Sequence, residues 1–272
     1  MISKMFRIAS LIFLATIVLA SFALSSAAWA DTCSNASLRG AYGFAHSATD
    51  STGTPVSAAV SQITFDPSTG TFSVDTTSSR DGVISTFSTT GTYAVASNCT
   101  GTGTPMGANA FNFVVTPRGF LVSEPFSPTT GFTAEGFAVK QGSSSCTNGR
   151  VEGSFGLQTT GVFLVGAPTT GAVALVGELK LMVNSSGEGV ISGHLAGSEG
   201  GTILTFADEP VSGSYTVNTD CSGTATIKPK GQPEMQFSLA VVDCGREMLV
   251  IETDADTIVS GGLVRNEVER RD

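Results

Sequence analysis

The chain contains two divergent copies of one segment, and this internal duplication constrains its fold more than any other feature of the sequence. Cys33 is followed after six residues by GAYGF (residues 40–44), and Cys146 is followed after six residues by GSFGL (residues 153–157). A second block, GTYAV with CTGT (residues 91–95 and 99–102), recurs as GSYTV with CSGT (residues 213–217 and 221–224). A repeat of this length indicates a duplicated domain rather than a solenoid unit.

Weaker matches continue the two copies toward their ends. They pair Phe113–Val115 with Ala240–Val242, Leu121–Glu124 with Leu249–Glu252, and Gly136–Lys140 with Gly261–Arg265. A short Gly and Ser linker near residues 141–145 separates the copies. The sequence therefore predicts one domain over residues 31–142 and a second over residues 146–272, each long enough to bury a core.

The N-terminus resembles a cleavable export signal. Lys4 and Arg7 precede an uncharged apolar run from Ile8 to Leu24, and Ala28-Trp29-Ala30 forms a small-x-small cleavage site before Asp31. An uncleaved membrane anchor is the alternative, because the run is near the lower length limit for a membrane span. We expect residues 1–30 to be removed and the rest to reach the periplasm or the extracellular medium, without stable membrane insertion.

The charge balance excludes some partners. The whole chain carries a formal net charge of −9, and loss of the positive signal leaves −11. Binding to nucleic acid or to anionic lipid surfaces needs a positive face, so neither is expected.

The cysteines indicate disulfides, because all five lie in the part expected to be exported. A thiolate zinc site is improbable, because the chain has no Cys-x-x-Cys pair. Cys33 corresponds to Cys146 in the repeat and Cys99 to Cys221, which predicts bridges Cys33 to Cys99 and Cys146 to Cys221 and leaves Cys244 free. A bridge between Cys221 and Cys244 is the rival arrangement.

The first copy reads as about eight strands joined by short turns. Apolar residues alternate with small polar ones, as Ile63 and Phe65 do, and turns such as DPSTG (residues 66–70) separate the runs. The expected strands cover residues 38–47, 58–65, 71–76, 83–96, 100–104, 110–116, 120–126 and 132–140.

Short connections make neighbouring strands antiparallel. We therefore expect an all-β chain with two tandem antiparallel up-and-down β-barrel-like domains, since closure removes exposed sheet edges. A pair of β-sandwiches is the alternative. The glycines of Gly101-x-Gly103 and Gly187-x-Gly189 are interpreted as turn glycines.

The shared pattern, Cys-x6-Gly-x-aromatic-Gly followed by Gly-[Thr/Ser]-Tyr-x-Val-x3-Cys-[Thr/Ser]-Gly-Thr, resembles uncharacterised exported bacterial proteins with lipocalin-like or allene-oxide-cyclase-like barrels. The resemblance covers both copies and implies an apolar central cavity. It assigns no binding or catalytic residue to a position in this chain.

Catalytic, cofactor and metal motifs are absent from the sequence, so no catalytic residue, cofactor or metal ligand is assigned. His46 and His194 are interpreted as ordinary strand or loop histidines. Tyr93 and Tyr215 are interpreted as structural, with buried rings and a hydroxyl bonded at the rim.

Two groups of carboxylates are weaker candidates. Glu252, Asp254 and Asp256 alternate and so share one face of an extended chain, where calcium could bind. Glu124 and Glu135 are the carboxylates of the late strands in the first copy and could form an acid and base pair.

The two copies differ in how they are filled. Ten of the fourteen phenylalanines after the signal fall in the first copy, while the second is richer in Val, Leu and Met. An aliphatic interior leaves room for a small apolar ligand in the second copy, a hypothesis that fails if this interior is solidly packed.

These observations favour an exported, non-enzymatic binding or surface-associated module, with a small apolar ligand as its partner. The alternatives are a structural component of the cell envelope or extracellular space, and an exported isomerase or hydrolase of a small apolar substrate. The sequence leaves the oligomeric state open.

Overall fold

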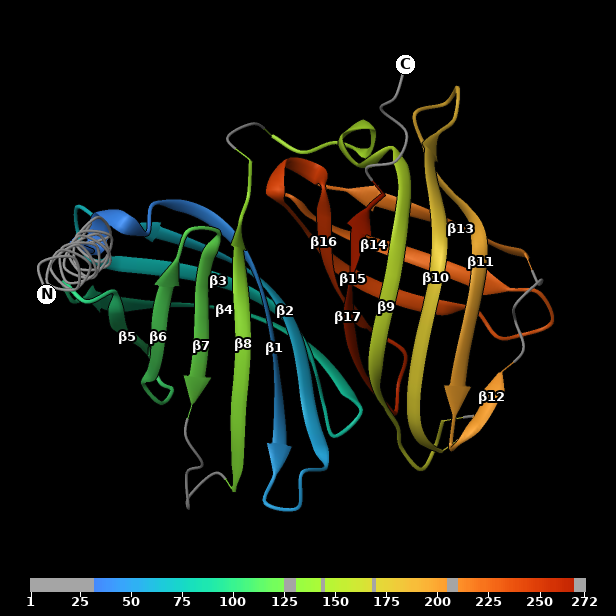
Figure 1. The fold of residues 1–272 in the computed structure, drawn as a ribbon, viewed down its shortest axis with the longest axis horizontal. Coiled ribbons are helices and arrows are strands. Elements are labelled where there is room, and N and C mark those ends of the chain that lie inside the picture. The colour runs from blue at the N-terminus through green and yellow to red at the C-terminus, as the bar shows by residue number, and fades with distance from the viewer. Residues whose placement is uncertain (1–31, 125–130, 143–144, 168–169, 205–209, 267–272) are drawn as a thin grey trace, which may run out of the picture.

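The protein is an all-β molecule of two closed antiparallel barrels that lie side by side (Figure 1). A computed structural model describes residues 32–124, 131–142, 145–167, 170–204 and 210–266. The expected signal peptide, residues 1–30, lies outside the described residues. Within them, no helix has the length and apolar character needed to cross a bilayer.

The first barrel closes through pairing of its first and last strands. Its strands are β1 (Gly40–Asp50), β2 (Pro55–Asp66), β3 (Thr71–Arg80), β4 (Val83–Val95), β5 (Thr100–Pro105), β6 (Phe111–Thr116), β7 (Gly119–Glu124) and β8 (Phe132–Lys140). Each strand pairs with the next along the chain, as expected from the short turns. The barrel architecture is therefore confirmed over the sandwich alternative.

The second barrel also closes, through pairing of β10 with β11. Its strands are β9 (Gly153–Phe163), β10 (Gly171–Val183), β11 (Gly189–Glu199), β13 (Pro210–Val217), β14 (Ser222–Pro229), β15 (Met235–Val242), β16 (Glu247–Glu252) and β17 (Thr257–Arg265). A short additional strand, β12 (Thr202–Leu204), pairs with β11 alone. The first barrel has no counterpart of β12 among its described strands.

Each barrel is closed at one end by a short 3-10 turn that a disulfide ties to the wall. Cys33 bonds to Cys99 and Cys146 bonds to Cys221, which are the pairs that the repeat predicts. The turns η1 (Asn35–Ser37) and η2 (Asn148–Val151) follow the first cysteine of each pair.

Leu38 and Val151, each five residues after the first cysteine of its bridge, have no exposed surface and plug the barrel ends. The sulfur bridge and the apolar plug therefore act on the same turn. Cys244 is free and exposed, in the turn η3 (Asp243–Gly245).

Two expectations about individual residues were wrong. The pairing of Gly101 with Phe113 in the first barrel is equivalent to that of Gly223 with Leu239 in the second. Phe113 therefore corresponds to Leu239 and not to Ala240, and a one-residue shift in a strand exchanges the two faces. Gly101 and Gly103 also lie within β5 and not in a turn, and glycine is needed there because the rings of Phe113 and Phe111 occupy the space that a side chain would fill. Gly187 does lie in a turn, with a positive φ, and Gly189 begins β11.

The two barrels pack against each other through apolar outer faces. A cluster of buried residues spans β1, β2 and β8 of the first barrel and β15, β16 and β17 of the second. Its buried members are Ala45, Ala58, Val60, Val139, Ala240, Val242, Leu249, Ile251 and Ile258. The contact is close because Gly43 has no side chain; a Cβ there would lie 2.4 Å from Cγ1 of Val242.

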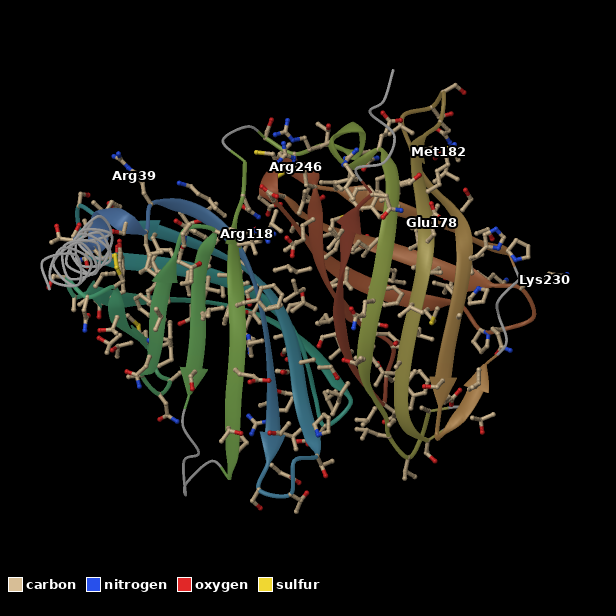
Figure 2. All side chains as sticks on the ribbon, in the orientation of Figure 1. Arg39, Arg118, Glu178, Met182, Lys230 and Arg246 are labelled. Carbon is tan, nitrogen blue, oxygen red and sulfur yellow. A yellow bond between two sulfur atoms is a disulfide. The ribbon has the colours of Figure 1, made fainter. Side chains whose placement is uncertain are left out.

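Polar contacts fix the orientation of the two barrels at both ends of this interface. The Asp256 N–H donates to the Gly82 carbonyl oxygen at 2.9 Å, and the Ser79 hydroxyl donates to the Thr257 carbonyl oxygen. On the opposite side, Arg118 forms an ion pair with Glu247. Figure 2 shows Arg118 and Arg246 near the top of this junction.

Candidate functional site

The barrel interiors are packed with side chains. In the first barrel, Phe65 and Phe120 lie at the centre of a cluster of aromatic rings, with their own ring centroids 5.4 Å apart. In the second, mainly aliphatic side chains surround a cavity of about 20 Å³ between Leu179, Met248 and their neighbours. A void of that size holds about one water molecule, whereas ligand pockets are commonly about 300 Å³ or more. This cavity therefore has no room for the apolar ligand that the sequence suggested.

A large and mainly apolar hollow lies between the two barrels, and we call it the inter-barrel groove. Its volume is about 870 Å³. Four exposed apolar side chains line it, namely Leu121 and Phe137 from the first barrel and Val176 and Val264 from the second, with exposed fractions of 55, 40, 52 and 58%. Large apolar side chains rarely gather in solvent without a binding role.

Polar side chains surround this apolar floor. Gln158 and Thr160, on the outer face of β9, are exposed in the groove. Glu135, on β8, is exposed there as well, and among the described residues it is the one carboxylate that lines the groove. The groove thus offers a negative charge and hydrogen-bonding groups beside an apolar surface, the usual composition of a small-molecule site.

His46 points into the first barrel, because it alternates along β1 with the inward Tyr42 and Phe44. Its ring stacks on Phe44 with 5.1 Å between centroids. Its Nδ1 is buried and has no hydrogen-bond partner in the described part of the chain. Burial lowers the pKa of His46 to about 4, so the ring is neutral at physiological pH.

His194 is exposed on β11 of the second barrel, opposite Glu178 of β10. Figure 2 shows Glu178 and Met182 along β10. The two histidines therefore lie on different barrels, and the structure does not bring them together. Glu135 lies in the inter-barrel groove, while the side chain of Glu124 lies outside the described part of the chain.

Glu252 and Asp254 lie at one end of the second barrel, with the Glu252 carboxyl buried inside it. Burial and the neighbouring Asp254 raise the pKa of Glu252 to about 8. The pKa of Asp254 is also raised by burial, although its Oδ2 accepts the Gln236 N–H at 2.8 Å.

The calcium site considered for residues 252–256 is not assembled. Asp256 turns away to contact Gly82 of the other barrel. Among the described residues, no three His, Cys, Asp or Glu side chains group as a metal site would.

Two asparagines that the sequence analysis missed hold the barrel ends together. Oδ1 of Asn35 accepts the Val95 N–H, and Oδ1 of Asn148 accepts the Val217 N–H, each at 2.8 Å. The signal was present, because each asparagine follows the first cysteine of its repeat by two residues, as Cys-x-Asn.

The equivalent tyrosines have the structural role expected of them. The Tyr93 hydroxyl donates to the Asn35 carbonyl oxygen, and the Tyr215 hydroxyl donates to the Asn148 carbonyl oxygen, both at 3.1 Å. Both rings are buried. Burial raises the pKa of each tyrosine to about 12, so both hydroxyls stay protonated and can donate.

Two closed barrels, each with its own disulfide, define a tandem β-barrel protein with a large apolar groove at the junction. No protein-family model and no curated protein matches the chain. A match among solved structures is a protein of unknown function from the DUF3598 family of Nostoc punctiforme PCC 73102. It is 13% identical, covers 85% of this chain and 97% of that chain, and has a TM-score of 0.24, which supports no argument about function.

Proposed function

We propose that the protein is an exported, non-enzymatic binding protein that holds a small apolar molecule in the inter-barrel groove. The observation that carries this proposal is the gathering of four exposed apolar side chains, two from each barrel, in one groove of about 870 Å³. The two disulfides are consistent with an oxidising compartment.

The proposed site differs from the central cavity that a lipocalin-like resemblance implies. The aromatic cluster of the first barrel and the aliphatic core of the second occupy the positions that a ligand would take inside a barrel. The groove instead requires both barrels, since Phe137 comes from β8 and Val264 from β17. Duplication would then create the site, because neither barrel supplies it alone.

Glu135 sets a preference among apolar ligands. Its carboxylate faces a groove in which no Lys or Arg occurs among the described lining residues. A fully anionic amphiphile would be repelled, and a neutral ligand or one with a cationic group would be accepted. The expected ligand is therefore apolar and uncharged or cationic.

The test is titration of the oxidised two-barrel protein with Nile red, a neutral apolar dye whose fluorescence rises in an apolar environment. We expect saturable binding that Val176→Asp and Val264→Asp each weaken by about tenfold or more, because each places a charge on the apolar floor. Val165→Asp is the matched control, since Val165 is 91% exposed and does not line the groove.

Equal binding by the two groove variants and the Val165→Asp control would refute the groove as the site. Absence of saturable dye binding by the unmodified protein would favour the alternative, a structural component of the cell envelope or extracellular space.

A further inference from the structure

One edge of β4 has no neighbouring strand in the described part of the chain. β3 pairs with β4 from Val83 onward, but β5 pairs only with residues 91–95. Residues 83–89 of β4, which we call the free edge, are therefore unpaired on the side where β5 would continue. The barrel wall is incomplete there because β5 is short.

The unpaired groups can be assigned by the alternation of an antiparallel ladder. The Thr90 carbonyl oxygen accepts the Met106 N–H at 2.8 Å, so the even-numbered residues of β4 point toward the β5 side. The N–H and C=O groups of Ile84, Thr86 and Ser88 thus face the free edge. Their spacing matches the ladder that an added extended strand requires.

The free edge carries none of the usual protection against an added strand. Residues 83–89 include no charged residue and no proline, which are the common means of blocking an edge. Val83 and Phe87 are 68% and 51% exposed. They lie on the face of β4 that would be shared with alternate side chains of an added strand.

A second, polar groove of about 630 Å³ runs beside this edge, between the outer faces of the two barrels. Thr86 and Ser88 lie in it, and its charged lining residues are Asp75 of the first barrel and Asp220 of the second. Asp75 lies across β4 from the free edge, because it belongs to β3, pairs with Ser88 and accepts the Ser88 hydroxyl. The part of the lining that the structure describes is thus negative and includes no Lys or Arg.

We infer that the free edge of β4 binds an extended peptide segment of another protein in which basic and apolar residues alternate. The backbone of the segment continues the sheet beyond Ile84, Thr86 and Ser88. Its basic side chains lie over Thr86 and Ser88 and face Asp75, while its apolar side chains cover Phe87. This inference is independent of the proposed ligand in the inter-barrel groove.

A second copy of the chain fits the edge less well. The chain has a net charge of −9, and the free edge brings no basic residue of its own. Edge-to-edge pairing of two copies would join two strands that both lack a basic residue, so it would bring Asp75 no countercharge. Charge complementarity therefore favours a basic peptide.

The experiment measures fluorescence anisotropy of the labelled peptide Lys-Val-Lys-Val-Lys-Val-Lys with the oxidised two-barrel protein. We expect saturable binding, and about tenfold weaker binding by Glu-Val-Glu-Val-Glu-Val-Glu and by a version of the lysine peptide with a central proline. Thr86→Pro should weaken binding of the lysine peptide by about tenfold, because it removes an edge N–H that no β3 group uses. Thr86→Val is the control, because it keeps that N–H, and it should bind the lysine peptide as tightly as the unmodified protein does.

Asp75→Asn tests the charge component separately. This substitution should weaken binding of the lysine peptide about threefold at low salt. It should leave binding of the uncharged peptide Thr-Val-Thr-Val-Thr-Val-Thr unchanged. Equal binding of the proline-containing peptide, or no effect of Thr86→Pro in a protein with an unchanged circular dichroism spectrum, would overturn the inference. A dimer in sedimentation that Thr86→Pro dissociates would overturn it as well, because it would assign the edge to a second copy. Nile red binding should be the same in all these variants.

Discussion

At the scale of single residues, the buried Glu252 makes the stability of the second barrel depend on pH. Glu252 is 3% exposed, and its Oε2 has no hydrogen-bond partner in the described part of the chain. Its carboxyl neighbour is Asp254, which in turn accepts the Gln236 backbone N–H and lies near Glu234. None of them supplies a positive charge, so the neutral form of Glu252 is favoured.

The folded-state pKa of Glu252, about 8, lies above its ordinary value of 4.5. The folded protein therefore binds the proton more tightly, and the resulting stability is complete below about pH 4.5 and is lost as pH rises through 8. We expect the free energy of unfolding to fall by a few kcal/mol across this range.

Glu252→Gln should abolish most of this pH dependence and be more stable than the unmodified protein at pH 8. Guanidinium unfolding at several pH values is the measurement. An unchanged pH profile in the variant would show that other groups cause the dependence.

The two asparagines give a second prediction at this scale. Asn148→Ala leaves the Val217 N–H without its acceptor, at an expected cost of about 1 to 2 kcal/mol in the free energy of unfolding. Asn35→Ala does the same to the Val95 N–H and should cost a similar amount. Denaturant unfolding of both variants is the check, and a negligible loss in either would contradict the assigned role.

At the scale of elements, each disulfide holds a terminal turn against its barrel wall. The bridges span sequence separations of 66 and 75 residues. Loops of this size correspond to about 4 kcal/mol of stability in the chain-entropy model. Replacing Cys33 and Cys99 by Ser, or Cys146 and Cys221 by Ser, should each lower the free energy of unfolding by about this amount.

Cys244→Ser is the matched control, because Cys244 is exposed and forms no bridge. It should leave both the unfolding curve and the mapped disulfides unchanged. Loss of a native bridge in this variant would show that Cys244 takes part in the pairing after all.

Much of this level of structure could be predicted from the sequence. The strands of the first barrel fall close to their expected ranges, because alternation and turns such as residues 66–70 are local signals. The interface between the barrels was missed. Its signal was a run of consecutive apolar residues, as in Met248–Ile251, which are all buried because the strand is covered on both faces.

The inter-barrel groove could not be predicted for a related reason. Leu121 and Phe137 belong to one copy and Val176 and Val264 to the other, and only the packing of the barrels brings them together. The repeat instead predicted two similar and separate domains. The free edge was not predicted either, although the expected strands at 83–96 and 100–104 differ enough in length to leave part of the longer one unpaired on that side.

At the scale of the whole molecule, Gly43 permits a close approach of the two barrels. A side chain at Gly43 would lie 2.4 Å from Val242 and 3.1 Å from Ala240, both buried. Gly156 is the equivalent position in the second copy, and a Cβ there would have its nearest neighbour at 3.7 Å. Gly156 is therefore a control position for the effect of a side chain at Gly43 on the interface.

We expect Gly43→Ala to lower the free energy of unfolding by about 1 to 3 kcal/mol through overpacking, and Gly156→Ala to change it little. Chemical denaturation followed by circular dichroism measures both. If both substitutions changed the free energy of unfolding equally, the contact between Gly43 and Val242 would be able to adjust to a larger side chain without loss of stability.

The bridges join cysteines that are consecutive in the chain, Cys33 to Cys99 and Cys146 to Cys221, and the odd thiol comes last. Synthesis runs from the N-terminus, and domains commonly fold in that order. An oxidant that joined thiols in order of their appearance would therefore form each native pair at the first attempt. Maturation of this protein would need an oxidase but no isomerase, and Cys244 would emerge only after its competitors had already been oxidised.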